Sequence, residues 1–188
     1  MKNSRVAFMK PIIETERLIL REVDIECDLE PWVDMMSDEE TVRFIGGQTM
    51  DHAASWRQMA MVIGHQVVRG YSFWSTIEKA TGDFVGRVGL WSPVGWPEPE
   101  IGWTIHRNYT RRGFAKEAGA ACVDYAFETL GWDRCIHVIG EENIGSIKTA
   151  EAIGSKRLYK VDKLPPFGDV KCWAYGQTRE EWESRNET

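Results

Sequence analysis

The turn within residues 108–118 (NYTRRGFAKEA) constrains the fold most strongly, because it joins an apolar strand directly to a helix. The first N–H groups of a helix lack partners within the helix, and the helix dipole places positive potential at that end. A basic, glycine-bearing turn at a helix start is therefore a natural seat for a phosphate or pyrophosphate. The segment predicts a strand, an anion-binding turn and a helix in succession; a plain solvated turn is the alternative.

The size and charge of the chain limit the classes of protein to which it can belong. Its 188 residues, of which 43% are hydrophobic, suit one compact domain over residues 1–188. The net charge of -6 argues against binding to nucleic acid, because a surface that follows phosphates normally carries a basic excess. This acidic balance favours a cationic substrate.

Cysteine usage and hydropathy indicate a reduced, cytoplasmic protein. Cys27, Cys122, Cys135 and Cys172 are far apart and form no zinc-ligand pattern with histidine, so we expect free thiols and no metal. No segment approaches the roughly 20 apolar residues that cross a bilayer, and the N-terminus lacks the apolar run of a signal peptide. We therefore expect no membrane association.

Hydrophobic periodicity divides the chain into strands and helices. Strands are expected at residues 14–22, 71–78, 83–92, 100–105, 135–139, 157–161 and 170–175, and helices at 24–36, 51–70, 116–130, 144–153 and 179–182. Asp51 and Thr178 are suitable helix caps, and Gly70, Gly131 and Gly154 are expected to end helices. The pattern predicts a mixed α/β chain without repeats or linkers.

The strand expected at residues 100–105 alternates strictly, which fixes the face that each side chain occupies. Ile101, Trp103 and Ile105 share one face. Glu100 is therefore expected on the opposite face of the sheet.

Several nucleotide motifs are missing, and a different family pattern is present. No GxxxxGK[ST] loop and no GxGxxG turn occurs, which disfavours ATP and NAD. Residues 100–103 are EIGW, residues 109–118 are YTRRGFAKEA, and residues 143–146 fit NxxS before a helix that ends at Gly154. In this order the motifs resemble the GNAT acetyltransferases over essentially the whole chain. Residues 14–21 (ETERLILR) resemble the branch that includes the ribosomal-protein N-acetyltransferases.

The resemblance implies a fold and a ligand. The fold would be a central mixed, mostly antiparallel sheet of about six or seven strands, flanked by helices and splayed where acetyl-CoA enters. The implied acetyl-CoA contacts are the backbone amides of Arg111, Arg112, Gly113, Phe114 and Ala115 for the pyrophosphate, the main chain of Trp103, Thr104 and Ile105 for the pantetheine arm, and Asn143 and Ser146 for its far end. Gly113 would let the backbone approach the phosphates closely. No metal is required.

Acetyl transfer to an amine needs a neutral nitrogen, a polarised thioester carbonyl and a proton for the departing thiolate. Glu100 is the first candidate for the base, acting directly or through a water, and Glu98 could replace it. The alternative for Glu100 is a rim carboxylate that only attracts a cation.

Ser146 is the first candidate for the proton donor, because ribosomal-type relatives place a serine at this spacing after the asparagine. Helix capping explains Asn143 and Ser146 equally well. Tyr159 is a second candidate, with a buried strand tyrosine as its alternative role. Many relatives carry a tyrosine donor where this chain has Ala150, so the proton donor stays open. The phosphate loop of the broad family usually begins with Gln or Arg where this chain has Thr110, but the ribosomal-type branch is looser at this position.

Trp91, Trp96 and Glu98 are expected to line the acceptor pocket, although core packing is the commoner role of tryptophan. We expect an N-acetyltransferase that transfers an acetyl group directly, in a ternary complex, to a protein N-terminus or a small-molecule amine. A catalytically inactive acyl-CoA sensor and a partner-binding domain without coenzyme are the alternatives. The resemblance also allows a homodimer, and the identity of the amine stays open.

Overall fold

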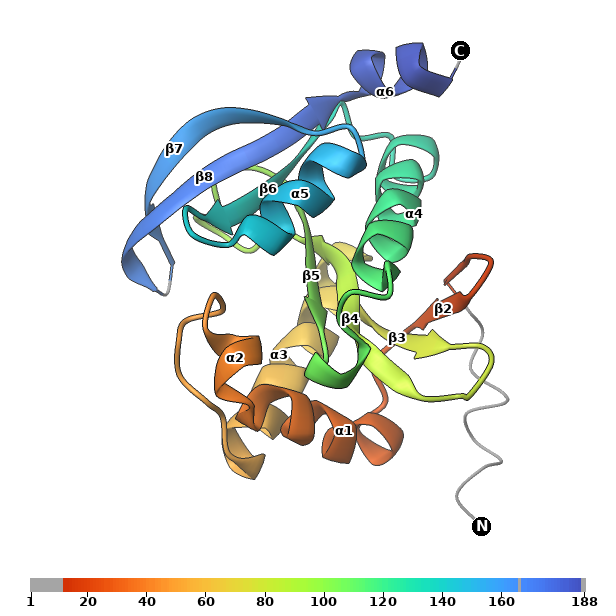
Figure 1. The fold of residues 1–188 in the computed structure, drawn as a ribbon, viewed down its shortest axis with the longest axis vertical. Coiled ribbons are helices and arrows are strands. Elements are labelled where there is room, and N and C mark those ends of the chain that lie inside the picture. The colour runs from red at the N-terminus through yellow and green to blue at the C-terminus, as the bar shows by residue number, and fades with distance from the viewer. Residues whose placement is uncertain (1–11, 166, 187–188) are drawn as a thin grey trace.

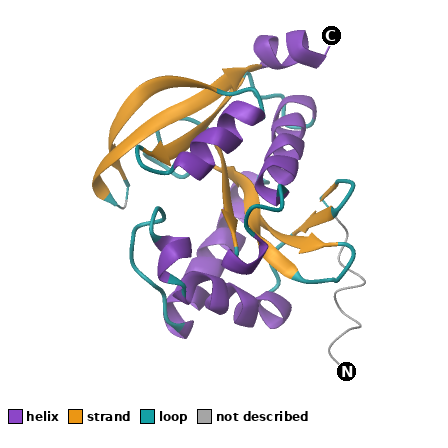
Figure 2. Ribbon diagram, in the orientation of Figure 1, coloured by secondary structure: helices purple, strands orange, loops and turns teal. Residues whose placement is uncertain are grey.

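The computed structural model describes residues 12–165 and 167–186, which form one eight-stranded sheet with helices packed against it (Figures 1 and 2). The strand order is β1-β2-β3-β4-β5-β6-β8-β7, and only the β5–β6 pair is parallel. The strands are β1 (Ile13–Glu14), β2 (Leu18–Arg21), β3 (Phe73–Glu78), β4 (Phe84–Trp91), β5 (Glu100–Ile105), β6 (Arg134–Gly140), β7 (Lys156–Leu164) and β8 (Gly168–Thr178). The helices are α1 (Ile25–Ser37), α2 (Glu39–Val42), α3 (His52–Arg69), α4 (Phe114–Glu128), α5 (Ile144–Ala152) and α6 (Arg179–Asn186).

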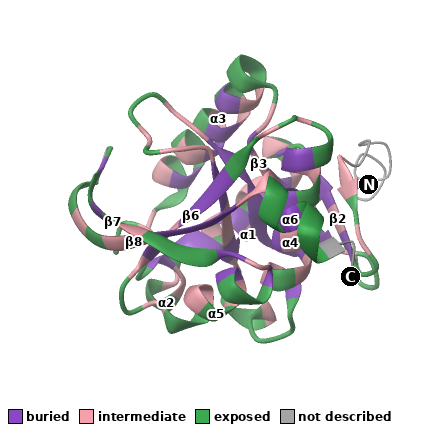
Figure 3. Cartoon of the chain, turned by 90° about the horizontal axis from the view of Figure 1, so that it is seen from above, coloured by how far each residue is buried: buried purple, intermediate pink, exposed green. Residues whose placement is uncertain are grey.

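The helices cover both faces of the sheet, and the two largest of the four core clusters lie beneath them. One cluster joins α4 to β2, β4 and β5, and the other joins α1 and α3 to β3 and β4. Every residue of β4 is buried, as expected for a strand covered on both faces. Helix α6, by contrast, is largely exposed (Figure 3). In Figure 1 the helices α1, α2 and α3 group at one end of the molecule, while α4 and α5 lie beside the other half of the sheet. No helix within the described residues is long and apolar enough to span a bilayer.

A buried ion pair fixes α1 to the sheet. Both terminal nitrogens of Arg21 donate to the Asp28 carboxylate, at 2.6 and 2.7 Å, and the Ser75 hydroxyl donates to it at 2.6 Å. Arg21 and Asp28 are 3% and 1% exposed. Because three donors meet one carboxylate without competition from water, α1 is locked onto β2 and β3.

The sheet splays between β5 and β6. The strand β5 pairs with β4 at six positions but with β6 only at Glu100 and Ile136. Two side chains bridge the gap in place of a main-chain ladder. The His137 Nδ1–H donates to the Ile101 carbonyl at 2.6 Å, and the Val138 N–H donates to Glu100 Oε1 at 3.2 Å. The splay leaves main-chain groups at the far end of β5 without a partner strand.

The predicted fold is confirmed, with one strand more than expected. The extra strand arises because the strand expected at residues 14–22 is broken by a turn, which separates the two-residue β1 from β2 and pairs them antiparallel. The four-residue helix α2 was not predicted either, because one turn is too short for a helical period. Helix α4 begins at Phe114 rather than at Lys116, and β8 extends to Thr178. The predicted faces of β5 are confirmed, since Ile101, Trp103 and Ile105 pack with α4.

Candidate active site

A cleft of about 690 Å³ opens where β5 leaves β6. Its walls come from the end of β5 and the turn after it (Trp103, Thr104, Ile105, Arg107, Tyr109, Thr110, Arg111), the start of α4 (Gly113, Phe114, Ala115, Lys116), α2 and its following turn (Glu40, Thr41, Phe44, Ile45) and α5 (Asn143, Gly145, Ser146, Thr149). All the residues predicted to hold a coenzyme therefore lie around one cleft, with the exception of Arg112. The Arg112 side chain instead reaches Glu78, at 3.4 Å, and lies near the Tyr109 ring.

The loop before α4 presents a row of free amides to the cleft. Arg111 and Gly113 both have left-handed backbone angles, with φ of 60° and 84°. Within the described part of the chain, no acceptor is found for the N–H groups of residues 111–116, whereas the N–H of Glu117 already bonds to the Gly113 carbonyl at 3.0 Å. Successive amides in such turns, placed at a helix start, form a concavity for anions. The loop can therefore hold a phosphate or pyrophosphate.

Two residues from the N-terminal motif support this loop from outside the cleft. Arg17 donates from Nη1 to the Arg112 carbonyl at 3.0 Å and from Nε to Glu117 at 2.7 Å. Thr15 also donates to Glu117, at 2.5 Å, and the Arg17 guanidinium lies 4.8 Å from the centre of the Phe114 ring. Together these donors hold the pKa of the Glu117 carboxyl below its usual value despite its partial burial. These contacts fix the first turn of α4. The environment of Glu117 is therefore that of a residue that stabilises the structure.

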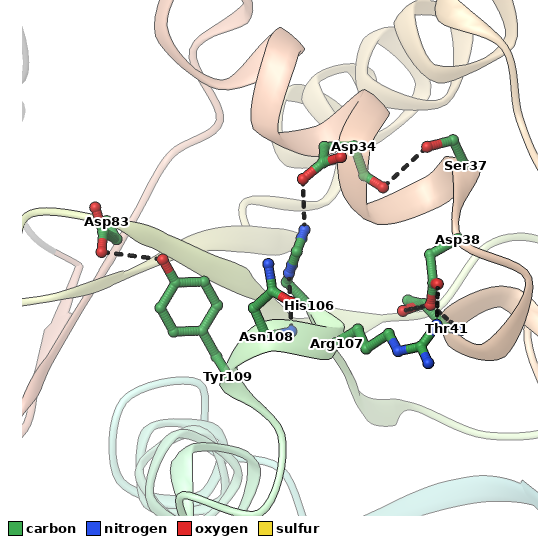
Figure 4. Close-up of polar contacts among 9 residues, drawn as sticks. All are labelled: Asp34, Ser37, Asp38, Thr41, Asp83, His106, Arg107, Asn108 and Tyr109. Atoms are coloured by element: carbon green, nitrogen blue, oxygen red, sulfur yellow. Dashed lines mark hydrogen bonds and ion pairs between the residues drawn. The ribbon is translucent and has the colours of Figure 1, made fainter.

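The segment between β5 and the loop is tied to three other elements (Figure 4). His106 contacts Asp34 on α1 at 2.8 Å, and Arg107 contacts Asp38, the N-cap of α2, at 3.0 Å. On the other side, the Tyr109 hydroxyl donates to Asp83 at 2.9 Å. The wall made by α2 and the wall made by the loop are thus joined through one short turn.

The start of α5 brings Ser146 to the cleft. Asn143 caps the helix, because its side-chain oxygen accepts the Ser146 N–H at 3.2 Å. The Ser146 hydroxyl accepts a hydrogen bond from Trp103 Nε1, also at 3.2 Å. Since the oxygen serves as acceptor there, the hydroxyl proton can be donated in another direction. Asn143 and Ser146 therefore take part in the cap of α5 and also line the cleft.

Glu100 is a buried carboxyl at the splay. It is 8% exposed and is not among the residues that line the cleft. Its Oε2 accepts from Trp96 Nε1 at 2.6 Å, and its Oε1 accepts from the Val138 amide. Burial raises the pKa of Glu100 to about 7, although these two hydrogen bonds and the charge of Arg87 act to lower it. Near neutral pH, Glu100 can therefore both bind and release a proton.

A family model described as "Acetyltransferase (GNAT) domain" matches residues 17–156, about three quarters of the chain. The chain belongs to the GNAT acetyltransferase family. Among curated proteins it is similar to the uncharacterised N-acetyltransferase YoaA of Bacillus subtilis, with 29% identity over 180 residues, covering 92% of this chain and all of that protein. The prediction of an N-acetyltransferase from the GNAT family is thus confirmed.

Solved GNAT structures share the architecture. An acetyltransferase of Agrobacterium tumefaciens superposes with a TM-score of 0.77 and 26% identity, covering 92% of this chain and 96% of that one. The ribosomal-protein-S5-alanine acetyltransferase of Vibrio fischeri superposes with a TM-score of 0.71 at 13% identity, covering 90% and 97%. A member of the ribosomal-protein branch, to which the sequence was predicted to be similar, thus shares the fold of this chain. At 13% identity the similarity concerns the fold alone.

The residues predicted for the GNAT acceptor pocket lie at different depths. Trp91 is 9% exposed and stacks on His65 and Phe73, inside the core. Trp96 is partly buried and holds Glu100. Glu98 accepts the Tyr159 hydroxyl at 2.5 Å and lies 3.2 Å from Arg134, and burial together with Glu98 raises the pKa of Tyr159 to about 12. Glu98 and Tyr159 are thus hydrogen-bonded to each other.

Sequence reasoning did not identify the supporting residues. Arg17 and Thr15 belong to a motif that was recognised, but their partner Glu117 is about a hundred residues away. No local pattern marks such a contact. The part of the cleft wall that α2 forms was not predicted, because a four-residue helix is too short to show a helical period. Arg87 lies in the middle of a buried strand and belongs to no motif.

Proposed function

We propose that this GNAT protein transfers an acetyl group from acetyl-CoA directly to a primary amine within a ternary complex. The observation that carries the proposal is the single cleft that joins the free amides of residues 111–116 to the unpaired end of β5. A ligand with a diphosphate at one end and an amide-bearing arm would use both.

The residues present fit acetyl-CoA. The amides from Arg111 to Ala115 would receive the pyrophosphate, with the charge of Arg111 nearby. The main chain of β5 from Trp103 to Ile105 would pair with the amides of the pantetheine arm as an added strand does. When bound, acetyl-CoA supplies a thioester, whose carbonyl carbon accepts an amine nitrogen.

Glu100 is proposed as the base, acting through a water because it lies behind the cleft wall. The amine nitrogen forms the new C–N bond, the C–S bond breaks, and the proton lost by nitrogen goes to the Glu100 carboxylate. With its pKa at about 7, Glu100 is substantially ionised at neutral pH and still basic enough to accept a proton. Ser146 is proposed to give its hydroxyl proton to the departing thiolate and to regain one from solvent, while Glu100 returns its proton to solvent, so that both residues end the cycle as they began it.

The test is thiol release from acetyl-CoA with a panel of primary amines that includes N-terminal peptides. For the wild type, kcat/KM should rise with pH up to about 7 as Glu100 ionises. Glu100→Gln should lower kcat by about a hundredfold or more and lose this inflection, while CoA affinity by calorimetry stays unchanged. An unaltered rate and pH profile in Glu100→Gln would remove Glu100 from the mechanism.

A second candidate is an acyl-CoA-binding module without catalysis, favoured by one observation. Ala150, which takes the place of the tyrosine donor of many relatives, is fully buried against Ile139 and Tyr175, so no hydroxyl is available at that position. Tight CoA binding without thiol release for any amine in the panel would favour this module over the enzyme.

A further inference from the structure

Two arginines are buried among the residues that the structure describes, and only one of them forms an ion pair. Arg21 is 3% exposed and forms a two-point ion pair with Asp28. Arg87, in the middle of β4, is 6% exposed. Among the residues that the structure describes, none accepts a hydrogen bond from the Arg87 guanidinium or forms an ion pair with it, and its Nε is fully enclosed.

Aromatic rings hold this guanidinium in place without neutralising it. Its carbon lies 4.2 Å from the centre of the Phe73 ring and 5.6 Å from that of Trp32. Burial lowers the pKa of Arg87 to about 10, so the side chain still carries its charge at neutral pH. An unpaired buried charge is strongly unfavourable, whereas stacking on rings contributes only about 1–2 kcal/mol. A bound anion would supply the missing partner.

Neither buried carboxylate on this face of the sheet bonds to Arg87. The charge of Glu100 acts on Arg87 without a hydrogen bond or ion pair between them, and Asp28 is occupied by other donors. Ser75 lies opposite Arg87 in the β3–β4 register, and its hydroxyl is bonded to Asp28. Asp28 also accepts from both Arg21 nitrogens and from the Asp24 amide, at 3.0 Å. Asp28 therefore has its own donors and leaves Arg87 free for a ligand.

The strand register places Arg87 on the same face of the sheet as the proposed base. Arg87 lies opposite Thr104, which lines the cleft, and Trp91 lies opposite Glu100. Directly opposed residues of antiparallel strands share a face. Between these pairs, Gly89 faces Gly102 and adds no side chain, and the Phe73 ring covers that position. The charge of Glu100 acts on Arg87 across the surface formed by these two glycines and the Phe73 ring.

We propose that Arg87 binds a carboxylate of the acetyl acceptor, so that the acceptor is a free amino acid whose amine lies toward Glu100 and whose carbon skeleton packs on Phe73. A guanidinium matches a carboxylate by two parallel hydrogen bonds. A carboxylate is preferred over a phosphate because it balances the single charge of Arg87 with no second buried charge. This inference rests on the proposed function and narrows its acceptor from any primary amine to amines that carry an anion.

The test compares each of the twenty amino acids with its carboxamide, which has nearly the same size but no negative charge. Carboxamides have the less basic amine, so chemistry alone favours them; a preference for the acid reports binding of the carboxylate. Wild type should use at least one acid with kcat/KM tenfold or more above that of its amide. Equal use of acids and amides, or use of amides alone, would overturn the inference while leaving the acetyltransferase intact.

Substitutions of Arg87 test whether its side chain causes the preference for the acid over the carboxamide. Arg87→Met should remove it by lowering kcat/KM for the acid tenfold or more with the amide unaffected, and Arg87→Lys should keep part of it. Arg157→Met is the matched control, because Arg157 is also stacked on an aromatic ring, Trp173 at 4.7 Å, but is exposed. A preference that stays at its full wild-type size in Arg87→Met or in Arg87→Lys would refute the role of Arg87. If Arg87→Met does not fold, Arg87→Lys decides alone.

Binding provides a readout independent of turnover. Trp32 lies beside Arg87, so an amino acid should change the tryptophan fluorescence of the CoA-saturated wild type, and its amide should not. The absence of any carboxylate-dependent change would overturn the inference even without catalysis. CoA binding, measured first in the same sample, tests the proposed function separately.

Discussion

Replacing Arg17 should weaken coenzyme binding although this side chain is not among those that line the cleft. Arg17→Met removes the bond from Nη1 to the Arg112 carbonyl and the contacts with Glu117, so the amides of the loop lose their support. A hydrogen bond from a charged group contributes about 1.5–3 kcal/mol, and an exposed ion pair adds at most about 1 kcal/mol. Because Arg17 is itself exposed, we take about 2 kcal/mol, which corresponds to an approximately thirtyfold rise in Kd for CoA.

The assay is isothermal titration of CoA into wild type, Arg17→Met, Arg17→Lys and Arg57→Met. Arg57 is an exposed arginine on α3, outside the cleft, so its variant controls for the loss of one positive charge. Lysine keeps the charge but cannot reach the carbonyl and Glu117 with separate nitrogens, so Arg17→Lys should fall in between, near fivefold. A Kd for Arg17→Met equal to that of Arg57→Met, or a rise in acceptor KM instead, would refute the supporting role of Arg17.

Three further outcomes follow from the packing and the loop. Asp28→Ala leaves the Arg21 charge buried without its carboxylate and should lower the free energy of unfolding by about 3–5 kcal/mol in urea; Arg21→Met in the same chain should recover part of it, and a loss below 1 kcal/mol would contradict the account. Burial lowers the pKa of His137 to about 4, so below pH 6.5 the unfolded chain takes up a proton that the native site refuses. Stability should therefore fall by about 3 kcal/mol between pH 6.5 and pH 4, and this part of the pH dependence should vanish in His137→Gln. Gly113→Ala forces a left-handed angle on alanine and brings a methyl group to 3.4 Å from Arg17 Nη2, which should raise the Kd for CoA about tenfold; an unchanged Kd would show that the loop does not bind the diphosphate.

The features that the sequence predicted well are those set by neighbours along the chain. Alternation in β5 placed Ile101 and Trp103 on the face that packs with α4, and Asp51 caps α3 as its residue type suggests. The left-handed turn before α4, which is proposed to bind the diphosphate, is equally local, because Gly113 and the helix start adjoin in sequence. Such features depend on backbone geometry over a few residues, which the residue types report directly.

The features that could not be predicted depend on contacts between distant segments. Glu100 is buried at the splay, where Trp96 and the amide of Val138 meet it, and no spacing in the sequence encodes that meeting. Burial raises its pKa although the two hydrogen bonds act to lower it. Arg87 has the composition of an ordinary polar residue in a strand, and only the packing of α1 and β3 around it shows that its charge is enclosed. Tertiary packing, and not local preference, decides both cases.

The most direct test of the account is a titration of the isotopically labelled protein with CoA, followed by amide chemical shifts. The largest shifts are expected at the amides of residues 111–115 and of β5 from Trp103 to Ile105, with α3 unaffected. Saturable binding that leaves the amides of residues 111–115 unmoved would contradict the placement of the diphosphate, and with it the mechanism built around the splay.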